Sequence, residues 1–208
     1  MVKPFILVLS LRWRGMFNLI TLRDTIRIDP SRFGEPLEEV ALDELKRKYE
    51  GLVDEELGYV ISIVDLKVDP VGRIVPGDGG THHRVVFTLL SFYPELQEVV
   101  EGEVVEVADF GTFLRIGPVD ALLHVSQLMD DFISYDEKHG VLLGKETGRR
   151  IQKGDIFRVR IVAVSFPKGR SAGKIGVTAR QPFLGRLDWI EEEVKRARGI
   201  TEEEAEER

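Results

Sequence analysis

The feature that most constrains the fold is a change in hydrophobic pattern at Pro94. After this proline, short segments rich in β-branched and aromatic residues recur between turn residues, and helical periodicity returns only at Leu187. Such a series predicts an all-β unit. Five strands in about 85 residues are typical of a small closed barrel of the OB type. We expect the strands at 103–108, 112–116, 121–125, 156–164 and 174–178, with a long polar loop over 130–152.

The part of the chain before Pro94 has a mixed pattern. Residues 17–28, 57–68 and 84–92 are rich in Ile, Leu, Val and Thr, and we expect them to be strands. A helix is predicted from Pro36, where apolar residues begin to recur at helical spacing, to Gly51, which marks its end. The order strand, helix, strand, strand predicts an α+β N-terminal domain.

These patterns divide the chain into four expected parts. They are an N-terminal extension (1–15), an α+β domain (16–94), a five-stranded barrel (95–187), and a C-terminal helix with an acidic disordered tail (188–208). The apolar run Phe5–Leu11 is much shorter than the roughly 20 residues of a membrane-spanning helix. The bulky residues Arg12, Trp13 and Arg14 do not resemble a signal-peptide cleavage site. We therefore expect a dispensable extension.

Composition limits the chemistry that this chain can perform. The sequence has no cysteine, which excludes disulfides and thiolate metal sites and fits a cytoplasmic setting. Its net charge of −7 argues against a nucleic-acid partner when taken alone. The segment 145–186, however, holds eleven Lys or Arg residues and only two acids. This segment is a candidate electrostatic footprint for a nucleic acid.

The string from Asp109 to Phe113 suggests a binding surface for bases. Gly111 permits a tight turn between two strands, so that Phe110 and Phe113 emerge on the same side of the barrel. A single Phe in this place would more often cap a barrel core than bind a ligand. Strand alternation turns Phe113 outward together with Arg115, and it turns His124 outward on the next strand.

Further cations follow from the same alternation. The apolar face of 156–164 leaves Arg158 and Arg160 together on the opposite face. Paired arginines on a strand are usually only solvated. In combination with two aromatic rings and a histidine, they are what sequence-tolerant RNA binding requires, since bases stack on the rings and cations contact the phosphates.

The spacing of these motifs resembles that of the S1 RNA-binding domain. The resemblance is carried by Gly102–Phe113, Leu123–Ser126, Lys153–Asp155 and Gly176–Thr178. It implies RNA contacts at Phe110, Phe113 and His124, and also at Lys174, where many S1 domains have a basic residue. The chain departs from the family pattern at Ser165, near which many S1 domains carry an acid.

Residues 16–195 as a whole resemble the E-prime family of archaeal RNA polymerase subunits, the counterpart of the seventh subunit of eukaryotic RNA polymerase II. The similar segments are Pro36–Gly51, 72–79, 129–138, 180–185 and 189–193. The resemblance implies a non-catalytic stalk subunit without a cofactor, which pairs with the smaller stalk subunit, called the F subunit, and binds nascent single-stranded RNA. It also implies docking on the polymerase body through a tip formed by Pro76, Gly77, Asp78, Gly79 and Gly80.

Two other functions remain open at this point. One is an S1 RNA-binding subunit of another complex, such as an exosome cap or a ribosome-associated factor. The other is a nuclease that holds Mg²⁺ through Asp130, Asp131, Asp136 and Glu137, although loop acids mostly face solvent and no nucleophile accompanies them. A metal site at His82 and His83 is disfavoured because neighbouring residues of a strand point to opposite faces.

Overall fold

The chain divides into two compact units, Met1–Tyr93 and Pro94–Arg208. The computed structural model describes residues 6–12, 15–167 and 173–198 of the 208. The predicted acidic tail lies beyond the described residues.

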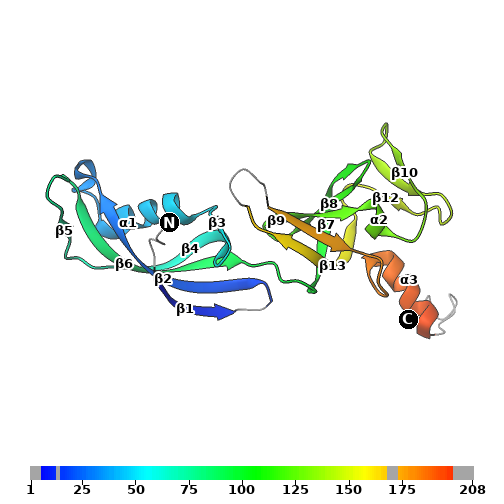
Figure 1. The fold of residues 1–208 in the computed structure, drawn as a ribbon, viewed down its shortest axis with the longest axis horizontal. Helices are drawn as coiled ribbons and strands as arrows, with labels where there is room; N and C mark the ends of the chain where they lie inside the picture. The colour runs from blue at the N-terminus through cyan, green and yellow to red at the C-terminus, as the bar shows by residue number, and fades with distance from the viewer. Residues whose placement is uncertain (1–5, 13–14, 168–172, 199–208) are drawn as a thin grey trace. The chain divides into compact units, whose positions relative to one another are not determined.

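The first unit is a twisted sheet with one helix against it (Figure 1). The strand order is β1-β2-β6-β4-β3, with β5 paired to β6, and every pairing is antiparallel. A short 3₁₀ turn, Pro30–Arg32, follows β2. The elements are β1 (Ile6–Arg12), β2 (Phe17–Ile28), α1 (Leu37–Tyr49), β3 (Val53–Asp54), β4 (Gly58–Val68), β5 (Arg73–Ile74) and β6 (Thr81–Phe92).

The helix α1 forms where the apolar spacing predicted it and contributes Val40, Ala41, Leu45 and Tyr49 to the core of the first unit. Acids in its first turn and cations in its last turn complement the helix dipole. Leu45 and Tyr49 are buried against the sheet, where the ring of Tyr49 lies 5.0 Å from that of Phe87. The Tyr49 hydroxyl donates to Asp24 at 2.7 Å, so the polar end of this buried ring keeps a partner.

The segment predicted as a dispensable N-terminal extension contains a strand. Residues of β1 pair with β2 from Ile6↔Arg23 to Arg12↔Asn18, with a register shift between Leu7 and Leu9. This strand was not predicted because its apolar run is continuous, and such a run has no alternation that would distinguish a strand. The antiparallel pairing with β2 supplies the backbone hydrogen bonds of this strand.

The second unit is a closed barrel. Its strands run in the order β14-β9-β8-β7-β13, and a further pairing of β13 with β14 closes the ring. The core is made by fully buried side chains, among them Leu114, Leu123, Phe157 and Val159. The strands are β7 (Val99–Ala108), β8 (Gly111–Ile116), β9 (Val119–His124), β13 (Ile156–Ser165) and β14 (Lys174–Thr178), and β15 (Gly185–Arg186) pairs with β13.

The region predicted as a long polar loop carries a sheet of its own. Its strands are β10 (Ile133–Asp136), β11 (Val141–Gly144) and β12 (Arg150–Ile151). Val141, Leu142 and Ile151 are buried there, so a few apolar residues in a polar segment are enough to give this sheet a buried side. The prediction of a loop over 130–152 was wrong in this respect.

Two helices complete the second unit. The strand β9 ends at His124, one residue before its predicted end, and the short helix α2 (Val125–Leu128) follows it directly. The helix α3 (Leu187–Arg198) begins at Leu187, where the helical periodicity returns, and buries Trp189 and Ile190. The ring of Trp189 lies 5.6 Å from that of Phe157 at 82°, which attaches α3 to the barrel core. Together, the α+β unit, the five-stranded barrel and the C-terminal helix confirm the predicted fold class.

Among the described helices, none is long and apolar enough to cross a membrane.

Candidate nucleic-acid interface

The turn between β7 and β8 positions the first aromatic residue. A Cβ atom at Gly111 would lie 2.4 Å from the carbonyl oxygen of Leu123 and 2.9 Å from Cα of His124. Only glycine permits this approach of β8 to β9. The backbone N–H of Val125 donates to the carbonyl of Phe110 at 3.0 Å, which holds Phe110 beside the end of β9.

Two aromatic rings and a histidine lie on the outer face of β8 and β9. The rings of Phe110 and Phe113 meet edge to face, with centroids 6.0 Å apart at 85°, as their spacing predicted. Phe113 is opposite Leu122 in the register, and His124 is opposite Gly111. Phe113 and His124 are therefore diagonal neighbours on adjacent strands. Phe110 remains 46% exposed, so its ring is available for stacking.

His124 has a defined tautomer. The backbone N–H of Ser126 donates to His124 Nδ1 at 3.2 Å, and the Ser126 hydroxyl lies 2.9 Å from the same nitrogen. This histidine thus caps the N-terminus of α2. Because Nδ1 accepts a hydrogen bond, the neutral ring carries its hydrogen on Nε2. That nitrogen is the donor which the histidine offers to a ligand.

The predicted cations next to this face are partly engaged within the protein. Arg115 pairs with Asp120, which is opposite it on β9, and this pair holds the pKa of Arg115 above its usual value. Arg158 binds Glu101 at 2.8 Å across β13 and β7. Both arginines are neutralised by a neighbour. Their phosphate contacts would have to compete with these carboxylates.

Strand register separates the paired arginines of β13 from Phe113. Arg158 and Arg160 are opposite Glu101 and Val99 of β7, whereas Phe113 is opposite Glu106. A separation of five residues along a strand is about 16 Å. Arg160 donates to the carbonyl of Gln97 at 3.2 Å, and its Nε atom is buried. Strand alternation correctly turned both arginines away from the barrel core, but it could not predict this separation.

Lys174 occupies the first position of β14. It is exposed and pairs with Ser165 of β13 in the register. Within the described parts of the chain, no ion pair involves Lys174. It is the predicted cation that keeps the most available charge.

The predicted docking tip is organised by Asp78. Arg27 donates to its carboxylate through Nε at 2.9 Å and Nη2 at 2.7 Å, the backbone N–H of Gly80 donates at 3.0 Å, and His82 lies at 2.8 Å. These bonds, led by the one from Arg27, hold the pKa of Asp78 far below its ordinary range. The loop Pro76–Gly80 is therefore held in one shape by an ionised carboxylate.

The two adjacent histidines are engaged in separate hydrogen bonds. His83 is buried, with Nδ1 2.9 Å from the carbonyl of Asp69 and Nε2 3.1 Å from the Thr81 hydroxyl. His82 points away from it toward Asp78. Among the described residues, no group of three or more His, Asp or Glu side chains could hold a metal ion.

Three of the four acids considered for a nuclease are bonded to neighbouring groups of the second unit. Asp131 accepts hydrogen bonds from the Thr147 hydroxyl at 2.6 Å and from the backbone N–H groups of Thr147 and Glu146. These bonds lower the pKa of Asp131 to about 2. Asp136 binds His139 at 2.7 Å, and Asp130 pairs with Arg180. The fourth acid, Glu137, is exposed.

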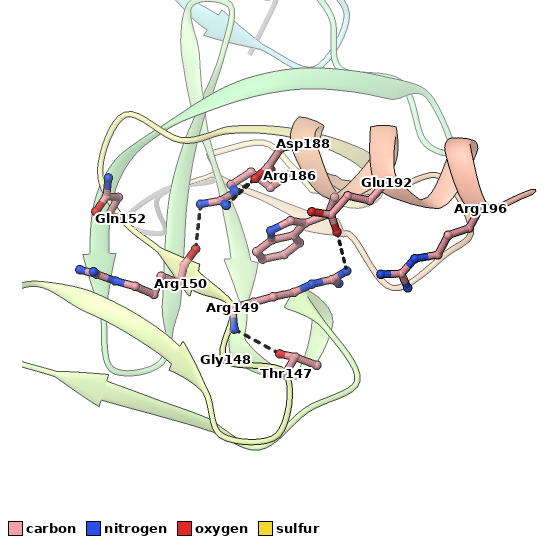
Figure 2. A pocket seen from close by; sticks show the side chains of 10 residues that line it. Thr147, Gly148, Arg149, Arg150, Gln152, Arg186, Asp188, Glu192 and Arg196 are labelled. Carbon is pink, nitrogen blue, oxygen red and sulfur yellow. Dashed lines mark hydrogen bonds and ion pairs between the residues drawn. The ribbon is translucent and has the colours of Figure 1, made fainter. Parts of the chain in front are cut away.

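A hollow lined by arginines was missed by the sequence analysis. It has a volume of about 700 Å³ and lies between β12, β15 and α3 (Figure 2). It is lined by Arg149, Arg150 and Arg186, which belong to the cation-rich segment 145–186, and by Arg196 of α3. The charge pattern was a usable signal. The pairing of β15 with β13 brings Arg186 close to the start of the cation-rich segment 145–186. The charge pattern alone could not predict this pairing.

Both units match known domains. Residues 23–79 match the SHS2 domain found in the N terminus of Rpb7p/Rpc25p/MJ0397, and residues 93–175 match the S1 RNA binding domain. The two matches lie in the first and second structural unit, with the second beginning one residue before Pro94. They agree with the α+β sheet and the closed barrel described above.

Whole-chain relatives are RNA polymerase subunits. The DNA-directed RNA polymerase subunit Rpo7 of Saccharolobus shibatae is 42% identical over 175 residues, which cover 84% of this chain and 97% of the relative. Rpo7 of Sulfolobus acidocaldarius is 38% identical, with coverage of 88% and 99%. The DNA-directed RNA polymerase III subunit RPC8 of Bos taurus is 27% identical, with coverage of 84% and 98%. Since both units match and the archaeal relatives align over nearly their whole length, this chain belongs to the Rpo7 family of DNA-directed RNA polymerase subunits.

Proposed function

We propose that this chain is a non-catalytic stalk subunit that binds nascent single-stranded RNA through its S1 barrel. The observation that carries the proposal is the edge-to-face pair Phe110–Phe113 beside His124 on the outer face of the barrel, in which Phe110 is exposed and Phe113 is half-buried. The exposed surface of aromatic rings offers planes to unpaired bases, and these planes favour no particular base. The bases of a duplex are stacked on each other and cannot use them.

The polar groups around the rings suit a ligand with phosphates. His124 offers Nε2–H, and Lys174 offers a charge on the neighbouring strand β14. Arg115, Arg158 and Arg160 contribute less, because each already has a partner within the unit. With a net charge of −7, the protein should bind RNA with modest affinity that falls steeply with salt.

We further propose that the first unit docks on the polymerase body through its tip. The loop Pro76–Gly80 is held by Asp78, and next to it Val71, Ile74 and Val75 are exposed, Ile74 by 75%. Exposed apolar side chains on a pre-ordered loop are typical of a protein–protein contact. A partner surface would bury them without a large cost in conformational entropy.

Pairing with the F subunit of the polymerase is proposed from the relationship to Rpo7, as is a cytoplasmic location. No catalytic role is proposed, because Asp131 and Asp136 are held by neighbouring donors and Asp130 pairs with Arg180. Polymerisation is then performed by other subunits of the enzyme.

Two measurements test the proposal. In the first, fluorescence anisotropy compares a labelled single-stranded RNA with a duplex of the same length at several salt concentrations. Preference for the single strand and a negative slope of log affinity against log salt support it. Equal binding of both RNAs would contradict the stacking surface.

The second measurement tests the assembly. The chain is co-expressed with a candidate F subunit, and gel filtration is followed by pull-down with the polymerase. A one-to-one complex that joins the polymerase supports the proposal. Co-purification with exosome subunits in place of polymerase would favour the alternative of an S1 subunit of another complex.

A further inference from the structure

The arginine hollow of the second unit has the composition of an anion-binding site. Its cations are the guanidinium groups of Arg149, Arg150, Arg186 and Arg196. Figure 2 shows Arg149 and Arg186 extending toward α3, with Arg196 projecting from that helix. Four guanidinium groups at one open hollow repel each other unless anions accompany them.

Trp189 holds two of the four arginines in place. Its ring centroid lies 4.6 Å from Cζ of Arg149 and 5.0 Å from Cζ of Arg186, and the ring is anchored on Phe157 of the barrel core. Arg186 also donates to the carbonyl of Arg150 at 3.0 Å. Guanidinium groups held by an aromatic ring lose little freedom when they bind a ligand.

The acids near the hollow do not pair with all of its cations. Arg186 is bonded to Asp188 and also to Asp155, and Glu192 approaches Arg149 only at 4.0 Å. Arg150 and Arg196 are exposed, and within the described residues no ion pair involves either side chain. Two positive charges therefore remain for an external anion.

The hollow continues toward the aromatic face. A second hollow of about 440 Å³ shares Arg149, Trp189 and Arg196 with the first and extends to Arg180. Arg180 donates through Nη1 to the carbonyl of Ser126 at 3.2 Å. Ser126 is also the residue whose backbone N–H donates to His124. One line of contacts thus runs from the face of β8 and β9, past the start of α2, to the arginines.

We propose that the arginine hollow binds backbone phosphates of the RNA strand whose bases stack on Phe110 and Phe113. The identity of the ligand rests on the proposed function, whereas the site itself rests on the two arginines without a described ion pair and on the shared hollows. A strand that occupies both places covers more nucleotides than the aromatic face alone. Single OB-type barrels cover about 4 to 16 nucleotides, which allows for such an extension.

The test removes the two arginines that have no described ion pair. The variant Arg150→Gln/Arg196→Gln is compared with Lys138→Gln/Lys195→Gln, which removes the same charge from exposed residues outside both hollows. All four side chains are on the surface, so both variants should fold, and circular dichroism checks this.

Binding is measured by anisotropy with single-stranded RNAs of about 4 and about 16 nucleotides across a range of salt concentrations. Each phosphate contact on a single strand contributes about 0.7 to the slope of log affinity against log salt. At 0.1 M salt, relative to 1 M, one contact therefore corresponds to about fivefold in affinity. The arginine variant should lower the slope for the long RNA by about 1.4 and weaken its binding by about 25-fold. Its binding of the short RNA should change less than twofold, and the lysine variant should resemble wild type with both RNAs.

The outcomes separate the two proposals. If the arginine variant binds the long RNA like wild type while the wild type still prefers single strands, the hollow is not a phosphate site and the aromatic face stands. An equal loss in the lysine variant would mean that only overall charge matters, which also overturns the inference. If the wild type binds neither RNA, the proposed function fails, and the hollow with it as an RNA site.

Discussion

Replacing Phe110 with alanine is the most direct test of the stacking surface. Phe110 is 46% exposed, whereas Phe113 is more deeply buried between β7 and β9. The single substitution at Phe110 therefore removes a ring available for stacking and leaves the barrel wall in place. A substitution at Phe113 would mix loss of binding with loss of core packing.

The cost to folding is small enough to separate from the effect on binding. Complete burial of a Phe side chain is worth about 1.5–3 kcal/mol, of which roughly half applies to a half-exposed ring. The edge-to-face contact with Phe113 adds about 0.5–1.5 kcal/mol. Against a typical free energy of unfolding of about 5–15 kcal/mol, the variant stays folded. Loss of a stacked base costs about 1–3 kcal/mol, so the dissociation constant should rise by about fivefold to about 150-fold.

The assay is fluorescence anisotropy with a labelled single-stranded RNA at fixed salt, together with urea unfolding of each variant. Phe132→Ala is the matched control, because Phe132 is 72% exposed on the same unit and lies outside β8 and β9. The control should bind RNA like wild type. The salt slope of Phe110→Ala should equal that of wild type, since the ring carries no charge.

Two results would refute this reasoning. If folded Phe110→Ala binds RNA with the affinity of wild type, bases do not stack on this face, and the ring only caps the barrel. If Phe132→Ala loses as much affinity as Phe110→Ala, any exposed aromatic ring contributes, and the geometry of β8 and β9 has no special role.

Three further predictions concern the fold. Gly111→Ala should destabilise the second unit by more than about 2 kcal/mol in urea unfolding, because its Cβ would lie 2.4 Å from the carbonyl oxygen of Leu123; an unchanged unfolding midpoint would contradict the close approach of β8 to β9. The pKa of Asp131 is lowered to about 2 from 3.8, so its stabilising effect should be complete above about pH 4 and be lost as the pH falls toward 2. The difference in unfolding free energy between wild type and Asp131→Asn should therefore shrink over this range, and a constant difference would argue against an ionised Asp131 as the cause. Deletion of residues 1–12 should leave the core of α1 folded but expose the edge of β2, and ultracentrifugation should then detect self-association; a strictly monomeric variant would mean that the β1–β2 pairing protects nothing.

Several elements could be predicted from local sequence with correct bounds. The strands β2 and β14 have the predicted bounds, and the helix α3 begins at Leu187, where helical periodicity returns. The helix α1 is delimited by Pro36 and by Gly51, which has a positive φ of 77°. The contact between Phe110 and Phe113 also follows locally, from a spacing of three residues across one glycine turn. In each case the deciding interaction lies within a few residues of the chain.

Other features depend on partners outside the segment itself. The strand β1 exists through its pairing with β2, and β10–β12 form around a few apolar residues in a polar segment. The separation of Arg158 from Phe113 results from the register of β13 on β7.

The arginine hollow is also a product of the tertiary structure, since β15 and α3 bring Arg186 and Arg196 to Arg149 and Arg150. The sequence by itself determined the periodicity of each element, the turn at Gly111 and the excess of positive charge in 145–186. Side-chain periodicity is a local property of the backbone, whereas register and barrel closure come from hydrogen bonds between strands far apart in the chain. For this reason the sequence could predict that a cationic surface exists, but only the tertiary structure decided which cations share it.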